Sequence, residues 1–118
     1  MASAPRLICA SAALVNSGRG TRFELDYHGE TAPGFVVRYG GRVYGYLNRC
    51  RHFSMELDWL EGEFFADDGC NLICSTHGAT YDCASGRCVS GPCEGASLVR
   101  LRVEERDGSV FYLGVDDE

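Results

Sequence analysis

Two short pairs of cysteine and histidine dominate this sequence. The first pair is Cys50-x-His52 and the second is Cys74-x-x-His77, with residues 53–73 between them. One loop can carry each pair and place a thiolate beside an imidazole, so two such loops together supply four ligands. Thiolate and imidazole select zinc, copper or iron–sulfur clusters over magnesium or calcium. The pattern therefore predicts a metal site before it indicates which metal.

The strongest local signal is a β-hairpin that leads to the first pair. Two runs of aromatic and β-branched residues, 35–39 and 42–47, flank Gly40-Gly41. A two-residue glycine turn between such runs is typical of a hairpin. The second run continues almost directly to Cys50, so we expect a rigid strand to position the first ligand loop.

The remaining pattern also favours strands. Residues 64–66 and 71–73 predict a second hairpin, whose return strand leads to Cys74. One or two helical turns are expected only within 54–60, and 28–34 is expected to be a loop. Further strands are expected at 6–15, 21–27, 79–81, 98–103 and 110–113. The chain is therefore expected to form a single all-β domain over residues 1–118, a sandwich or a small barrel.

The sorting of the ligands distinguishes two kinds of metal site. A tetrahedral zinc site made by two cysteines and two histidines has the right ligand count. Zinc fingers of that kind usually pair cysteine with cysteine and histidine with histidine, whereas each loop here brings one of each. A two-iron cluster can use this arrangement, because both thiolates bind one iron and both imidazoles the other, as in Rieske centres. A zinc-stabilised binding domain remains the alternative.

The chain resembles the Rieske 2Fe-2S proteins, and above all the small soluble Rieske-type ferredoxins. The resemblance rests on the two ligand motifs, on Gly78 directly after the second histidine, and on Gly86 followed by Gly91-Pro92. The spacing between the motifs is somewhat longer than is usual in the ferredoxins, and the expected second hairpin can absorb the difference. The resemblance implies an antiparallel β-sandwich with two ligand loops at one end of the domain.

The resemblance also implies one Rieske-type 2Fe-2S cluster per chain. Cys50 and Cys74 would bind the inner iron, and His52 and His77 would bind the outer iron near the surface. The Gly91-Pro92 segment would cover the cluster. Other residues expected around the cluster are Gly78, Tyr81 and Pro92.

Four positions bear on the reduction potential. High-potential members of the family carry a disulfide between the ligand loops and a serine two residues after the second histidine. By the resemblance, Met55 and Thr76 occupy the two disulfide positions here and Ala79 occupies the serine position, so both features are missing. Tyr81 matches a family tyrosine whose hydroxyl can reach a ligand sulfur, and a core aromatic is an equally good interpretation of it. Hydrogen bonds to the sulfurs tune the potential within a range of about −150 to +300 mV. We expect a low to lower-middle potential and no loop disulfide.

Composition and motifs argue for an electron carrier and against an enzyme. The chain has three histidines, and the cluster would take two, so His28 alone cannot supply the two histidines that a mononuclear oxygenase iron needs. No Gly-x-Gly-x-x-Gly motif opens a βαβ unit, which argues against a nicotinamide or flavin site. The net charge of −6 and the absence of lysine argue against nucleic acid and anionic membranes as partners. No run approaches the roughly 18 apolar residues of a membrane span.

The resemblance implies a one-electron carrier between a flavoprotein reductase and a terminal, ring-hydroxylating oxygenase. A Rieske small subunit of a larger oxidoreductase, such as an assimilatory nitrite reductase, is the alternative. The odd number of cysteines, seven, and the lack of a clear export signal predict a cytoplasmic protein with reduced thiols. Five cysteines have no assigned role and are expected to pack as small apolar groups: Cys9, Cys70, Cys83, Cys88 and Cys93.

Overall fold

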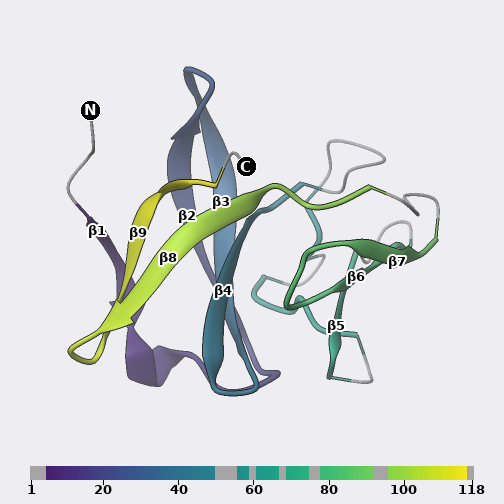
Figure 1. Ribbon diagram of the computed structural model, residues 1–118, viewed down its shortest axis with the longest axis horizontal. Helices are drawn as coiled ribbons and strands as arrows, with labels where there is room; N and C mark the ends of the chain where they lie inside the picture. Colours follow the sequence, from purple (N-terminus) through teal and green to yellow (C-terminus); the bar gives the residue numbers. More distant parts are fainter. Residues whose placement is uncertain are drawn as a thin grey trace.

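The computed structural model describes residues 5–49, 56–58, 61–66, 69–74, 78–91 and 96–116. These residues form nine strands and one short 3-10 helix, η1 (Ser11–Ala13). Figure 1 labels the strands along the chain. The strands are β1 (Arg6–Ala10), β2 (Thr21–Tyr27), β3 (Glu30–Tyr39), β4 (Arg42–Leu47), β5 (Asn71–Ile73), β6 (Thr80–Asp82), β7 (Cys88–Ser90), β8 (Arg100–Arg106) and β9 (Ser109–Val115). None of the described segments forms a helix long and apolar enough to cross a bilayer.

The strands form two antiparallel sheets, which confirms the all-β prediction. The larger sheet has the order β1-β9-β8-β4-β3-β2, and the smaller has the order β5-β6-β7. The chain leaves the larger sheet after Leu47 in β4 and returns at Arg100 in β8, and these two strands pair with each other. The smaller sheet is therefore an excursion between two neighbouring strands, and it lies beside the larger sheet (Figure 1). Both predicted ligand pairs belong to this excursion in sequence.

Two tight turns connect the three strands that lead to the excursion. Gly40 and Gly41 have φ values of 59° and 84°, which confirms the predicted glycine turn between β3 and β4. His28 and Gly29 form a second turn of the same kind, with φ values of 53° and 82°. Positive φ at both central residues matches the twist of a hairpin, and histidine is among the residues that adopt it more readily than most. The expected loop over 28–34 is therefore wrong, because β3 already begins at Glu30.

The first expected strand, 6–15, is also too long. The chain turns into η1 after Ala10, and Arg38 of β3 holds this turn by donating to the carbonyls of Ser11 (3.2 Å) and Leu14 (2.9 Å). Residues 11–14 are therefore held by a side chain of β3 and do not continue the strand. The local sequence pattern does not show this contact.

The smaller sheet differs from the prediction in three details. The expected strand at 64–66 is reduced to an antiparallel bridge between Phe65 and Leu72. β6 begins one residue later than expected, and β7 was not expected at all. β7 is too short to show an alternating pattern, and pairing of Ser90 with Thr80 in β6 fixes it. Of the expected helical segment 54–60, only residues 56–58 are described, and they are not helical.

The main core lies where the two sheets meet. It joins side chains of the larger sheet to those of the smaller sheet and of the segments around it. Its fully buried members include Phe35, Val37, Tyr46, Leu57, Phe64, Leu72, Cys74, Ala79, Tyr81 and Cys83.

Candidate metal centre

The second predicted ligand pair begins at Cys74, directly after β5. Cys74 is fully buried within the main core. Its N–H donates to the carbonyl of Ala79 (2.8 Å), and the N–H of Gly78 donates to the Cys74 carbonyl (2.8 Å). These bonds close a tight loop around a segment that contains His77 in sequence, and His77 itself lies outside the described residues. Gly78 has a φ of 74°, a conformation that favours glycine.

The Gly91 backbone packs directly on this loop. A Cβ atom at Gly91 would lie 2.8 Å from the Ala79 Cα and 3.3 Å from the Gly78 carbonyl oxygen, so the contact needs glycine. Gly91 also has a φ of 101°. The contact supports the predicted covering role of the Gly91-Pro92 segment; Pro92 lies outside the described residues.

Tyr81 lies on β6, opposite Leu72 of β5. It is fully buried and belongs to the same core cluster as Cys74. Its ring therefore packs in the core, and the predicted contact of its hydroxyl with a ligand sulfur stays a prediction.

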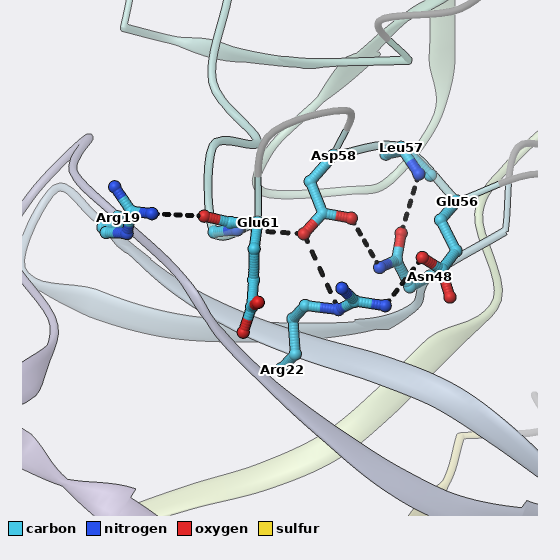
Figure 2. A network of polar contacts seen from close by, with 8 residues as sticks. Arg19, Arg22, Asn48, Glu56, Leu57, Asp58 and Glu61 are labelled. Carbon is cyan, nitrogen blue, oxygen red and sulfur yellow. Dashed lines mark hydrogen bonds and ion pairs between the residues drawn. The ribbon is translucent and has the colours of Figure 1, made fainter.

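The first predicted ligand pair follows Asn48, and both Cys50 and His52 lie outside the described residues. Asn48 comes directly after β4 and is fully buried. Its side chain donates to Asp58 Oδ1 (2.9 Å) and accepts from the N–H of Leu57 (2.8 Å), as Figure 2 shows. These two bonds join the chain on either side of the first ligand pair.

Asp58 continues this network with its second oxygen. Asp58 Oδ2 accepts from the N–H of Gly62 (2.9 Å) and lies 3.7 Å from Nε of Arg22. Arg22 also donates to Glu56 Oε1 (2.6 Å). The Asp58 side chain has no exposed surface, and a buried carboxylate is tolerated only where it is paired and hydrogen-bonded. Arg22 and the Gly62 amide meet that requirement.

Sequence reasoning gave no role to Asn48 and Asp58, whose contact joins the two flanks of the first predicted ligand pair. The structure buries both residues and also the apolar neighbour that precedes each, Leu47 and Leu57, and the sequence alone does not show this burial. Polar residues at such positions are usually hydrogen-bonded partners rather than surface groups.

The described cysteines outside the ligand motifs show no sign of metal chemistry. Burial, and to a lesser degree the charge of Asp82, raises the pKa of the Cys83 thiol to about 12. Burial also raises the pKa of the Cys9 thiol. Among the described residues, neither thiol belongs to a group of three or more His, Cys, Asp or Glu side chains that could hold a metal ion, so both suit packing. Cys70 is exposed, and its thiol raises the pKa of the Tyr39 hydroxyl.

The family model described as Rieske [2Fe-2S] domain matches residues 6–105 of the chain. The chain belongs to the Rieske [2Fe-2S] domain family. Membership implies a Rieske-type 2Fe-2S cluster as the cofactor, which decides against the zinc alternative. The two Cys/His pairs fit that cofactor, because they offer two cysteines and two histidines. Cys74 is the one of these four that the structure describes, and it is a buried thiol at the start of the second ligand loop.

Solved structures agree with this assignment. A chain in the complex of reduced oxygenase and oxidized ferredoxin of carbazole 1,9a-dioxygenase is 25% identical, with a TM-score of 0.73 over 95% of this chain and 94% of that one. The carbazole 1,9a-dioxygenase ferredoxin from Nocardioides aromaticivorans IC177 shares the fold at 21% identity, with a TM-score of 0.72 over 95% and 99%. A Sphingomonas yanoikuyae B1 ferredoxin does so at 22% identity, with a TM-score of 0.69 over 93% and 98%. No curated protein sequence matches the chain significantly.

Proposed function

We propose that this Rieske chain is a one-electron carrier whose cluster is held by Cys50 and Cys74 on one iron and by His52 and His77 on the other. The observation that carries the proposal is the family match over residues 6–105, which includes both Cys/His pairs. The buried position of Cys74 supports its assignment to the inner iron.

The cluster supplies the one-electron redox chemistry, and the chain supplies the environment. Imidazole is neutral, so two histidines in place of two cysteines make the site less negative and easier to reduce. Burial of Cys74 keeps water from its sulfur. The Gly91 backbone, packed against Ala79, covers the same loop.

A flavoprotein reductase and a terminal oxygenase are the proposed electron donor and acceptor. The similarity to a chain in a ferredoxin–oxygenase complex supports this pairing. The net charge of −6 would steer the carrier towards basic patches on both partners. We further propose that the carrier works in the cytoplasm.

A visible absorption spectrum and a low-temperature EPR spectrum, before and after dithionite, test the cofactor. We expect a red-brown protein whose reduced form has a lower average g value than all-cysteine clusters. A colourless protein with one equivalent of zinc would contradict the proposal.

Single substitutions test the ligand assignment. Cys50→Ser, Cys74→Ser and His52→Asn should each abolish the Rieske spectrum. Matched controls are Cys70→Ser and His28→Asn, since both residues are exposed, and both should keep it. A ligand variant with an unchanged spectrum would remove that residue from the site.

Electron transfer from a flavoprotein reductase at increasing salt tests the docking model. The rate should fall as ionic strength rises, because salt screens charge steering. A rate independent of salt would contradict electrostatic docking without affecting the cofactor assignment.

A further inference from the structure

A buried polar clamp closes the base of the first ligand segment. We define this clamp as Asn48, Asp58 and the backbone N–H groups of Leu57 and Gly62 (Figure 2). We propose that the clamp positions Cys50 and His52 for the cluster. The inference rests on the proposed function, because it requires these two residues to be cluster ligands.

One side of the clamp is anchored to the larger sheet. The N–H of Asn48 donates to the Pro33 carbonyl in β3 (2.8 Å), directly after Leu47 ends β4. The Asn48 side chain then reaches across to Leu57 and Asp58. Asn48 on one flank of the ligand pair is thus bonded to Leu57 and Asp58 on the other flank, and Cys50 is two residues from Asn48 in sequence.

The other side of the clamp is anchored to the start of β2. Asp58 Oδ2 faces Arg22 of β2 at 3.7 Å. The Gly62 carbonyl accepts from the N–H of Gly20 (2.7 Å), and Arg19 donates to the Glu61 carbonyl (2.7 Å). The segment after the ligand pair is therefore tied to the sheet through several separate bonds.

A purely stabilising role explains this arrangement poorly. Buried ionic groups often contribute no more stability than apolar side chains of similar volume. A hydrogen-bonded network fixes the orientation of its side chains as well as the distances between them. Such networks around metal sites orient the metal ligands.

The donors and acceptors of the clamp allow a matched exchange of side chains. Asn48→Asp alone sets two carboxylates against each other, and Asp58→Asn alone removes the charge that faces Arg22. When both changes are combined, a carboxylate at position 48 can accept from Leu57 N–H and from the new amide at position 58. The oxygen of that amide can still accept from Gly62 N–H. The double variant therefore preserves every hydrogen bond of the clamp.

The test compares the holoprotein of the wild type with Asn48→Asp, Asp58→Asn and the double variant. The measurements are the rate of iron loss to a chelator, the midpoint potential and the EPR g values. We expect Asn48→Asp to lose iron about 10–100-fold faster with shifted g values, and the double variant to recover most of this loss. Hydrogen exchange of the Leu57 amide in cluster-free protein gives a readout independent of the cluster, and it should be faster in Asn48→Asp.

Arg38→Gln is the control for general loss of stability. Arg38 of β3 bonds to Glu105 in β8 and to the carbonyls of Ser11 and Leu14, none of which belongs to the clamp. This variant should therefore unfold at lower temperature with wild-type g values. Iron loss from Asn48→Asp no faster than from Arg38→Gln, or no recovery in the double variant, would overturn the clamp proposal. A wild type without a cluster would overturn the proposed function and this inference with it. A cluster-bearing wild type with unaffected clamp variants would overturn this inference alone.

Discussion

The Phe35 ring stacks on the Phe64 ring, with centroids 3.8 Å apart and planes inclined by 9°. Phe35 belongs to β3 of the larger sheet, whereas the Phe64 carbonyl accepts from the N–H of Ile73 in β5 (2.9 Å). Both rings are fully buried in the cluster that contains Cys74. The stack therefore connects the scaffold to the strand that leads into the second ligand loop.

Removing one ring of this stack should lower the stability of the protein. Phe64→Ala is expected to lower the free energy of unfolding by about 3–5 kcal/mol, because a large buried side chain is lost and leaves a cavity. Urea denaturation measures the change. Phe111→Ala is the matched control, since Phe111 on β9 is only partly buried. Equal losses in the two variants would contradict the role assigned to the stack.

Tyr46 makes a second bridge between the sheets. Its hydroxyl donates to the Cys83 carbonyl (2.5 Å), and Gly86 lies against its ring. Tyr46→Phe would leave that buried carbonyl without its donor, so we expect a loss of about 1–3 kcal/mol in unfolding free energy. Tyr44→Phe, at a partly buried position of the same strand, should change it less.

The same tyrosine predicts an alkaline effect. Burial raises the pKa of Tyr46 well above its usual value. Because the unfolded phenol ionises near pH 10, the contribution of Tyr46 is fully present below that pH and is lost as pH rises above it. Urea denaturation at pH 7 and pH 10.5 should show a smaller decrease in stability for Tyr46→Phe than for the wild type. The same decrease in both would show that Tyr46 does not titrate with unfolding.

The sequence predicted the elements that local interactions determine, and it did not predict those that contacts between distant residues determine. The Gly40-Gly41 hairpin and strand 21–27 were predictable, because turn chemistry and alternation are local. η1 and β7 were not, because Arg38 and the pairing with β6 fix them from a distance. In the site, the ligand motifs are visible as spacing in the sequence. The contact between Asn48 and Asp58 depends on the fold, and no spacing rule predicts it.

Two cysteines should differ in reactivity with iodoacetamide in the folded holoprotein. Cys70 is exposed and should be alkylated first at pH 8. Cys83 is buried, and burial raises the pKa of its thiol to about 12, so almost no thiolate forms at that pH. Mass spectrometry of the digested protein distinguishes the two sites. Alkylation of Cys83 as fast as that of Cys70 would contradict the packing role of Cys83.

Arg38 and Glu105 predict an effect in acid. Two hydrogen bonds join the guanidinium to the carboxylate (2.6 and 3.1 Å), and they lower the pKa of Glu105. This contribution is present above the usual pKa of about 4.3 and is lost as pH falls through the lowered value. Between pH 6 and pH 3, stability should fall less in Glu105→Gln than in the wild type, as thermal unfolding would show. Glu104→Gln is the matched control and should follow the wild type.

Removal of iron should affect the two sheets differently. Each strand of the smaller sheet has only three residues, and β5 leads directly into Cys74. Such short strands depend on packing around them. The larger sheet also has hydrophobic clusters of its own, one around Leu25 and Leu101 and one around Val36 and Val110.

We therefore expect chelation of the cluster to speed amide hydrogen exchange in β5 and β6 while β2 and β3 keep most of their protection. Hydrogen exchange with mass spectrometry on holoprotein and apoprotein measures this, and reconstitution with iron and sulfide should reverse it. Equal loss of protection in both sheets would mean that the larger sheet also depends on the cluster. Unchanged protection in β5 and β6 would mean that the core around Phe64 and Tyr81 holds the smaller sheet without the metal.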